Sequence, residues 1–526
     1  MKARALRGTV LSVLLAVPAF ADVQTNTWIE GSSDWNAAAS YLENRVPSAG
    51  DAVVIPSGVT ATVSVVSTEA ANTVGSSFDV FSKLGRVLMT DATSAIILDI
   101  ADGVSVTNYC RIYGKSAGKG AIIKRGLGMI EFGTQTSAGY DLDLTVEEGA
   151  LALPQALTAE SGRSFYLRKV TVNEGAMLIT AEDDAHSSGL GYGATLIYEL
   201  WGGGIVTNRY SSNRLNFRSS NPPRYCEFSG IIGKGVRFSV GEKVNLMLTG
   251  TNSTVSPEIA GGAMLGFKKF GLKGQRSSMG TSGTIFRSGG GTALYLGEGE
   301  TSDKDFYFWH SGNEEGIIDG GATGGLNLTG TISYYVNNEK ESVGMKKLVL
   351  TGSNTVPCVF SGTLPTWSNP NGVAGTTNYN FHVMKRGTGT WRFADKSQTH
   401  AGGFTVEDGT LQFPSLAKRG TACSLGTATN LMEYYGGKID ESKRVDWAFA
   451  LGGASTRGRL EYIGTNDATC TTRPIVLKGL GGTYASASNV VMRFFGASAD
   501  SGVDSTLTLG GDSTAVTNMI GSISDG

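Results

Sequence analysis

Cysteine and histidine are scarce in this chain, whose 526 residues include five cysteines and four histidines. No Cys-x-x-Cys pair occurs, and no two histidines are spaced as metal ligands, so zinc and dithiol redox sites are not expected. The sequence predicts no cofactor and no metal. Cys423 and Cys470 are the one pair considered for a disulfide in an oxidising compartment; the alternative is that the cysteines are small buried core residues. The cysteines are Cys110, Cys226, Cys358, Cys423 and Cys470, and the histidines are His186, His310, His382 and His400.

Helical periodicity and long apolar runs are also missing. From residue 91 onward no stretch of twelve or more residues repeats its apolar positions with a helical period, whereas strand and turn signals recur every eight to twelve residues. Glycine is abundant, with 74 residues, and charged residues make up only 17%. The net charge is 44 − 46 = −2, which gives no reason to expect nucleic acid or an anionic membrane as a partner. The sequence therefore predicts an all-β protein.

The first 21 residues have the pattern of a secretory signal peptide. Lys2, Arg4 and Arg7 precede an apolar core at residues 10–17, and Ala-Phe-Ala at residues 19–21 is a small-x-small cleavage site. The apolar run is well short of the ~20 residues that a membrane span needs, and no other segment approaches that length. We expect Sec-type export to the cell surface in association with the outer membrane, to the extracellular space or to the periplasm, and no transmembrane segment in the mature chain.

A repeated unit is the strongest signal in the sequence. Residues 385–414 contain KRGTGTWRF and FTVEDGTLQFP, and residues 124–154 contain KRGLGMIEF and LTVEEGALALP. Five of nine and six of eleven positions are identical, at offsets of 261 and 260 residues, and VTVNEGAMLI at residues 170–179 is a third copy of the second half. Repetition of this kind indicates stacked structural units.

Each unit is predicted to be two short strands joined by a glycine turn. Phe404 and Val406 share one face, Gly409 supplies the turn, and Leu411 and Phe413 resume the alternation. Such a unit cannot bury its apolar face alone, so it needs neighbours stacked on it. A second signature, Leu-x-Leu followed by Thr or Gly and then Gly, predicts inward-facing leucines at four places, which begin at Leu246, Leu326, Leu348 and Leu507.

Residues 22–67 are predicted to be a separate β segment that caps the stack. Trp28 and Trp35 precede a turn at residues 47–51 and two strands at residues 52–55 and 59–65. We expect the two indoles to cover the open end, because terminal units of a stacked array must be capped. Stacking of a carbohydrate on these rings is the alternative interpretation.

Residues 385–411, with KRGTGTWRF and FTVEDGTL, resemble the autotransporter-associated β-strand repeat. Residues 460–526 are similar to the segments between such repeats, and the entry segment is similar to the N-termini of large bacterial surface proteins that carry them. The resemblance implies a right-handed parallel β-helix (a solenoid) in a passenger-type secreted or surface protein. It divides the chain into residues 1–21, 22–67 and 68–526, with the clearest repeats at 122–179 and 383–526. Members usually continue beyond the point where this chain ends, so a truncated C-terminus is expected.

One strand combines acids with aromatic residues. An enzyme on this scaffold would act on polysaccharide, and glycoside hydrolysis needs two carboxylates about 5–10 Å apart. Asp303, Asp305 and His310 are the catalytic candidates, and Tyr307 and Trp309 are candidates for carbohydrate binding. An aromatic strand with one buried face is the alternative. Glu182-Asp183-Asp184 with His186 is a second candidate cluster, for which a solvated loop is the alternative, and Glu314-Glu315 is a weaker third.

Taken together, the sequence predicts a non-enzymatic, exported, structural or adhesin-like surface protein. Its partner would be an unidentified extracellular ligand, matrix component or polysaccharide. The alternative is a polysaccharide-active or carbohydrate-binding β-helix, and catalysis is left open. Because the repeats share their inward positions and differ in the loop after the first strand, any binding by a unit is expected in that variable loop, which includes Asp395 and His400.

Overall fold

The structure is a computed structural model of the chain. It describes most of residues 24–524 in segments. The described segments are 24–114, 120–133, 142–153, 165–180, 195–208, 213–217, 224–233, 235–241, 243–253, 256–309, 314–335, 346–365, 381–429, 448–470, 472–486, 490–494, 496–499, 504–511, 518–520 and 523–524.

One ladder of parallel strands, here called face 1, runs through nearly the whole described chain. Each strand pairs with the strand that occupies the same place one turn later. Its strands are β3 (Thr60–Val65), β5 (Ala95–Ile100), β8 (Ala121–Arg125), β10 (Leu142–Val146), β12 (Phe165–Val172), β14 (Thr195–Gly202), β17 (Arg224–Phe228), β20 (Val244–Leu248), β22 (Ala263–Phe267), β24 (Gly291–Tyr295), β27 (Glu314–Asp319), β30 (Lys346–Thr351), β32 (Phe381–Lys385), β34 (Phe404–Val406), β36 (Phe449–Leu451), β39 (Ile475–Leu477), β42 (Ala497–Ala499) and β45 (Ile523–Ser524).

Face 2 consists of strands that each follow a face 1 strand across a corner. Within the described residues it forms two parallel ladders, one on each side of a break between β18 and β25. The first ladder contains β6 (Ser105–Asn108), β9 (Met129–Phe132), β11 (Ala150–Ala152), β13 (Met177–Thr180), β15 (Ile205–Asn208) and β18 (Ile231–Ile232). The second contains β25 (Glu300–Ser302), β28 (Leu326–Leu328), β31 (Cys358–Phe360), β33 (Thr390–Phe393), β35 (Gly409–Phe413), β37 (Gly458–Tyr462), β40 (Gly481–Ser486) and β43 (Thr506–Gly511).

Face 3 closes each turn where it is present, and it occurs in three described sections. All of its strand pairs are parallel. The sections are β1 (Thr25–Thr27), β2 (Ala52–Ile55), β4 (Arg86–Met89) and β7 (Arg111–Gly114); then β16 (Asn213–Phe217), β19 (Val236–Val240), β21 (Glu258–Ile259), β23 (Thr284–Phe286), β26 (Phe306–Trp309) and β29 (Ile332–Tyr335); and finally β38 (Ala468–Cys470), β41 (Met492–Phe494) and β44 (Asn518–Ile520).

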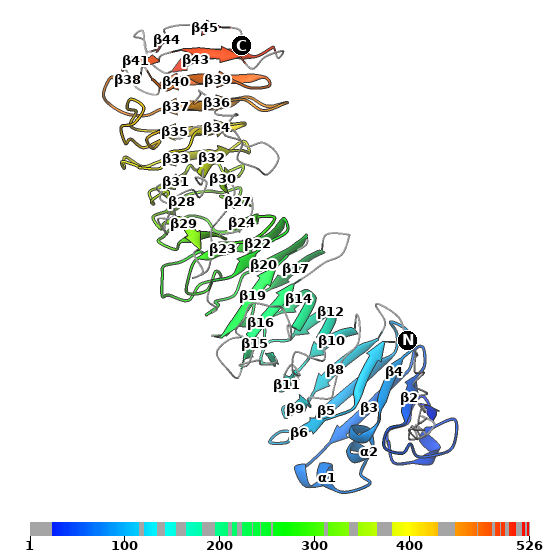
Figure 1. The fold of residues 1–526 in the computed structure, drawn as a ribbon. Helices are drawn as coiled ribbons and strands as arrows, with labels where there is room; N and C mark the ends of the chain where they lie inside the picture. The colour runs from blue at the N-terminus through cyan, green and yellow to red at the C-terminus, as the bar shows by residue number, and fades with distance from the viewer. Residues whose placement is uncertain are drawn as a thin grey trace, which may run out of the picture.

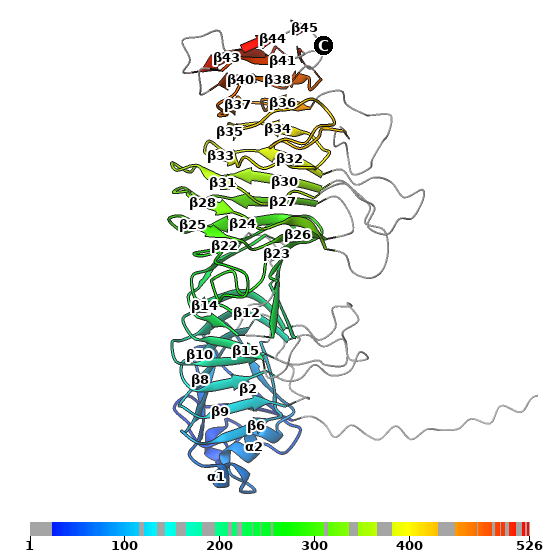
Figure 2. The same cartoon turned by 90° about the vertical axis from the view of Figure 1, so that its left-hand side faces the viewer.

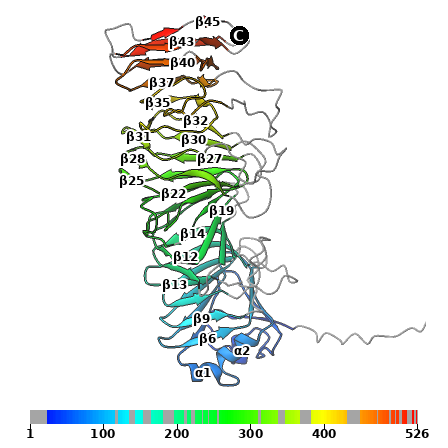
Figure 3. The same ribbon diagram turned by 60° about the vertical axis from the view of Figure 1, so that its left-hand side comes forward.

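The three faces are visited in a fixed order, so the chain is a parallel β-helix. After β24 on face 1 come β25 on face 2 and β26 on face 3, and β27 then returns to face 1. Gly291 is aligned with Gly316 and Gly458 with Gly482, so a plain turn takes 25 or 24 residues. Figure 1 shows the turns stacked from the blue N-terminal end to the red C-terminal end, and Figures 2 and 3 show the same stack from two other sides. The predicted fold class is confirmed.

Aromatic side chains and two short helices cover the N-terminal end. The stacked rings of Trp28 and Trp35 have centroids 4.3 Å apart, and Phe81 meets Trp35 edge to face. Both indoles are buried, which leaves no exposed ring face for a carbohydrate. The sequence analysis missed the helices, which contain only one or two turns and begin after serine N-caps. They are α1 (Thr68–Asn72) and α2 (Ser77–Lys83). The 3₁₀ helix η1 (Ala38–Ser40) follows Ala37 and has no side-chain cap.

The inward positions of the repeats form the core, as the alternation predicts. Leu411 is buried between Trp391 of the preceding turn and Leu460 of the next. The Leu-x-Leu pairs that begin at Leu246, Leu326 and Leu348 are fully buried, whereas Leu509 of the fourth copy is 46% exposed. The cysteines with described side chains, including Cys423, are buried free thiols; the side chain of Cys470 lies outside the described residues.

A buried lysine fastens the corner between faces 1 and 2 in both copies of the repeat. Lys385 Nζ donates to the carbonyls of Arg386 and Gly387 in its own corner, at 2.6 and 2.5 Å, and to Asp408 O in the next corner, at 3.2 Å. Lys124 Nζ makes the same three contacts, at 2.6, 2.6 and 3.3 Å, in the first copy. Gly126 and Gly387 turn these corners at φ +71° and +67°, which glycine adopts without steric cost.

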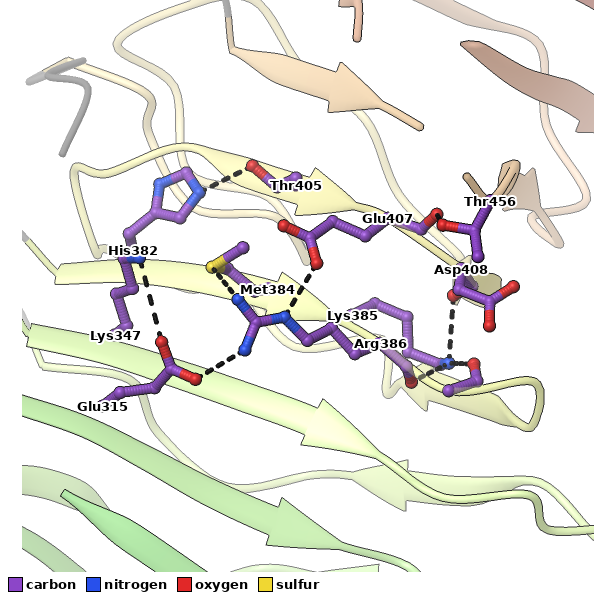
Figure 4. A network of polar contacts seen from close by, with 11 residues as sticks. Glu315, Lys347, His382, Met384, Lys385, Arg386, Thr405, Glu407, Asp408 and Thr456 are labelled. Atoms are coloured by element: carbon purple, nitrogen blue, oxygen red, sulfur yellow. Dashed lines mark hydrogen bonds and ion pairs between the residues drawn. The ribbon is translucent and has the colours of Figure 1, made fainter. Parts of the chain in front are cut away.

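The residue after each lysine joins the same two turns on the outside. Arg386 Nε lies 2.7 Å from Glu407 Oε2, and Arg125 pairs in the same way with Glu147 at 2.6 Å. Figure 4 shows Arg386 also bound to Glu315, with Lys347 beside the same carboxylate. The K-R-G and T-V-E elements that the two copies share therefore fasten successive turns to each other, one on the inside and one on the outside.

Replacing Lys385 by methionine is expected to lower the stability of the stack. The substitution keeps much of the apolar stem but leaves three part-buried carbonyls without their shared donor, and the full cost of about 1–3 kcal/mol for each unsatisfied group applies only to carbonyls that water cannot reach. We expect a loss of roughly 3 kcal/mol in urea unfolding, with faster hydrogen exchange at the corners on both sides. The matched control is Lys396→Met at an exposed site. Equal stability of both variants would show that the lysine contacts do not hold the corner.

Candidate functional site

The acids proposed as catalytic lie beside a loop that leaves the rod between β22 and β23. This loop, here called loop A, comprises residues 268–283. Asp303 Oδ1 accepts the Lys273 main-chain N–H at 2.6 Å. Asp305 Oδ2 lies 2.8 Å from Lys273 Nζ and accepts the Tyr307 hydroxyl at 2.9 Å, while its Oδ1 accepts the Thr331 N–H at 2.7 Å. Both carboxylates thus hold neighbouring chain in place.

Two further residues of the same segment clamp the base of loop A. Glu300 accepts the main-chain N–H groups of Phe270 and Gly271 at 2.5 and 3.1 Å. The Ser302 hydroxyl donates to Gly271 O at 2.6 Å. Carboxylates that accept main-chain N–H groups make charge-assisted hydrogen bonds, which are stronger than neutral ones.

A buried lysine completes the clamp from below. Lys304 is almost fully buried, and its Nζ donates to Ser277 Oγ at 2.8 Å and to Gly280 O. Burial lowers the Lys304 pKa to about 8, while the charges of Glu300 and Asp303 oppose that shift. Residues 300–305 therefore supply four charged residues to one loop, and the sequence analysis singled out two of them, Asp303 and Asp305.

The aromatic residues of the same strand form a column on the outside of face 3. The Arg287 guanidinium lies 4.0 Å from the Trp309 ring centroid, and the Tyr335 ring stacks on Trp309 at 5.1 Å with an interplanar angle of 16°. Arg287 comes from the preceding turn and Tyr335 from the next, so they cover opposite faces of the indole. A ligand that approaches from solvent therefore meets the edge of the Trp309 ring and not its faces.

Tyr307 stands beside this column. Its ring meets Tyr335 edge to face at 6.2 Å, and burial with the hydrogen bond to Asp305 raises the Tyr307 pKa to about 12. A role of Tyr307 or Trp309 in carbohydrate binding, and of Asp303 or Asp305 in catalysis, stays a prediction. His310, residues 182–186 and the Glu314 side chain lie outside the described residues.

A second loop has the same architecture as loop A. Loop B comprises residues 414–428 and follows β35. In loop A the Ser278 hydroxyl donates to Lys269 O and the Gly274 N–H to Thr281 O; in loop B Ser424 donates to Ser415 O and Gly420 to Thr427 O. The preceding turn contributes an antiparallel bridge in each case, Asn252 with Ser277 and Gln398 with Cys423. Every equivalent pair is 146 residues apart.

Loop B also encloses a buried cation, here an arginine. Arg473 is fully buried, and its guanidinium donates to four loop carbonyls, namely Leu425 O at 3.2 Å, Lys418 O at 3.4 Å, Thr421 O at 2.9 Å and Gly426 O at 2.7 Å. The Thr472 hydroxyl accepts the Arg419 N–H at 2.8 Å. As in loop A, the clamp comes from a segment later in the chain.

His400, which belongs to the variable part of the repeat, lies beneath loop B. Its carbonyl accepts the Thr427 N–H at 2.8 Å, and its ring meets Phe404 edge to face at 5.1 Å. The imidazole is buried, and neither ring nitrogen has a hydrogen-bond partner. Burial, reinforced by the Arg473 charge, lowers the His400 pKa to about 3. His400 is therefore a neutral support for the loop and is not exposed to a ligand.

The sequence analysis missed both loops. The signal that would have found them is Phe, six residues, Gly, three residues, Ser-x-Gly-Thr, which occurs at residues 267–281 and 413–427. Only four of thirteen residues are identical between 269–281 and 415–427, and the polar spacing carries no strand or helix period. The clamping cations follow at different distances, so no repeat search would have linked them to the loops.

Among the described residues, no group of three or more His, Cys, Asp or Glu side chains lies close enough together to hold a metal ion. The described part of the chain also contains no helix long and apolar enough to cross a membrane. The structure holds loops A and B in fixed positions on a stacked scaffold.

The chain is similar to a curated bacterial protein. It is 25% identical over 460 residues to "Adhesin BmaC autotransporter" from Brucella suis biovar 1 (strain 1330), a match that covers 85% of this chain. The chain spans 12% of the length of that relative. No protein-family model matches the chain, and no solved structure matches it. The expected likeness to autotransporter proteins is confirmed, whereas the specific type of repeat stays a prediction.

Replacing Lys304 by methionine is expected to loosen loop A without unfolding the rod. The variant removes the cation that binds Ser277 Oγ and Gly280 O, so loop A should exchange its amide hydrogens at least about tenfold faster, the change that corresponds to about 1.4 kcal/mol of lost local stability. The control is Lys268→Met, an exposed residue of the same loop. Unchanged exchange in Lys304→Met, measured by mass spectrometry, would show that the cation does not order the loop.

Acidification is expected to destabilise the rungs around loop B. The folded-state pKa of His400, about 3, lies below its unfolded value of 6.5, so the unfolded chain binds more protons between these values. The contribution is complete above pH 6.5 and is lost as the pH falls toward 3, by up to about 1.4 kcal/mol per pH unit. In urea unfolding between pH 7 and pH 4, His400→Phe should show a shallower pH dependence than the parent chain. An identical slope would exclude this role for His400.

Proposed function

We propose that this chain is part of an exported, non-enzymatic, adhesin-like bacterial surface protein. Its parallel β-helix is the stalk, and loops fixed on that stalk meet the extracellular partner. The observation that carries the proposal is the similarity to an autotransporter adhesin over 85% of the chain. A rod of stacked turns with clamped loops supports it, because loops positioned by a rigid scaffold are a common place for binding residues.

Export and segment order are part of the same proposal. Residues 1–21, which lie outside the described residues, act as the Sec-type signal peptide, residues 22–67 cap the stack and residues 68–526 form the repeat region. Buried Trp28, Trp35 and Phe81 at the N-terminal end are consistent with such a cap. The autotransporter-associated repeat is proposed as the unit from which the region is built.

The contacts around β26 favour a binding role over a catalytic one. Asp303 and Asp305 accept hydrogen bonds from the main chain of loop A and of the next turn, and Asp305 also pairs with Lys273. A general acid and a nucleophile must both face the scissile bond of the substrate. The polysaccharide-active alternative therefore requires these carboxylates to leave their present partners.

Beads coated with the purified chain are expected to adhere to cultured host cells or to an extracellular-matrix film. The control is the Leu411→Asp variant, which buries an unpaired charge in the stack and should lose both its cooperative melt and its adhesion. Adhesion no greater than that of albumin-coated beads would contradict the proposal. Release of polysaccharide fragments by the parent chain, abolished in Asp303→Ala and Asp305→Ala, would replace it with the enzymatic alternative.

A further inference from the structure

Loops A and B differ from the rest of the chain in their charge. Loop A contains Lys268, Lys269, Lys273 and Arg276, loop B contains Lys418 and Arg419, and neither loop contains an acidic residue. The whole chain is balanced, with 44 basic and 46 acidic residues. Six cations and no acids in these two short segments are therefore a local property of the loops.

Three cations of loop A are available to a partner. The side chains of Lys268, Lys269 and Arg276 are exposed, and none has a carboxylate partner among the described residues. Within the described part of the chain, Arg276 donates only to the Ser253 hydroxyl, at 3.2 Å. Lys273 is different, because its Nζ is paired with Asp305 at 2.8 Å.

The acids next to loop A do not cancel this charge. Glu300, Asp303 and Asp305 contact the loop and are occupied by its main-chain N–H groups or by Lys273. Lys304 is buried beneath the loop, where its Nζ donates to Ser277 Oγ. With the four loop cations, Lys304 and these three acids, the assembly carries 5 − 3 = +2, and its outer part is the cationic one. Lys418, Arg419 and the buried Arg473 give loop B +3, with no acid in its clamp.

Both loops present their cations on a fixed turn. Gly274 and Gly420 lie at the tips with φ +75° and +87°, and no atom comes within 4 Å of the place where a side chain would begin. The base of each tip is tied by the buried cation and by the serine hydroxyl of the loop. A preordered backbone reduces the entropy lost when a flexible charged ligand binds.

We propose that loop A, with loop B as a weaker copy, binds a sulfated polysaccharide. Clustered lysine and arginine side chains on a short segment are typical of sites for sulfated glycans and other polyanions. Phe270, the aromatic residue of loop A, is buried, so neither loop offers an exposed ring on which nucleic-acid bases would stack. This assignment rests on the proposed adhesin-like function and names the chemistry of one partner.

The probe is heparin, titrated into the purified full chain at about 50 mM and about 200 mM salt. The triple variant Lys268→Gln, Lys269→Gln, Arg276→Gln should bind at least about tenfold more weakly, with a smaller dependence on salt because fewer counterions are released. The loop B variant Lys418→Gln, Arg419→Gln should weaken binding less. The matched control removes the same charge from three exposed sites elsewhere, through Arg86→Gln, Arg457→Gln and Arg493→Gln, and should bind as the parent chain does.

Several results would overturn the inference. These are no binding of heparin by the parent chain, equal weakening in the loop A and control variants, or undiminished binding of chemically desulfated heparin. Duplex DNA that binds as tightly as heparin through the same residues would assign loop A to nucleic acid instead. If coated beads still adhere to cells while the loop A variant behaves like its parent toward heparin, this inference fails and the adhesin-like function stands. All substituted side chains are exposed except that of Arg419, which is half-buried, and an unchanged thermal melt will confirm that the variants fold.

Discussion

The structure depends on cations that bind main-chain carbonyls where the chain turns. Strands satisfy their own polar groups through the ladders, but a corner or an outgoing loop turns carbonyls inward, away from both the ladder and water. An unpaired buried carbonyl is costly, so each such place needs a donor. Lys124 and Lys385 supply it at corners, and Lys304 and Arg473 supply it beneath loops. An ammonium group offers three donors and a guanidinium five, which matches the larger number of carbonyls around Arg473.

This constraint separates the parts of the molecule that repeat from the parts that vary. The K-R-G and T-V-E elements fasten one turn to the next on the inside and the outside, so any change in them disturbs two turns at once. Three exposed cations of loop A carry no such duty. Lys268, Lys269 and Arg276 contact no neighbouring turn through a carboxylate in the described chain, and they are free to differ as the partner requires. Scaffold and recognition thus use the same type of residue, a basic side chain, in opposite ways.

The fold was predictable from the sequence, whereas most of the site was not. Alternation around Phe404, Val406 and Leu411 identified the inward ladder because apolar burial leaves a period of two in the sequence. The same repeats contained Lys385 and Arg386, but their partners include main-chain carbonyls and a carboxylate one turn away, which alternation does not reveal. Asp303 and Asp305 attracted attention as acids near aromatic residues; their contacts with loop A depend on a chain reversal that only the stacking of turns creates. The short helices escaped because a serine cap and one or two turns leave too little periodicity.

The clamps also impose an order of assembly, because residues later in the chain complete each loop. Loop A is complete only when residues 300–305, one turn farther along the chain, have stacked on it. Loop B likewise requires Thr472 and Arg473, which also come later in the chain. Each loop therefore becomes ordered only after the turn that follows it in the chain has stacked. A nascent or damaged rod that ends at the loop lacks the clamping residues and does not present an ordered tip. Binding by either loop therefore requires correct stacking of the turn that follows it.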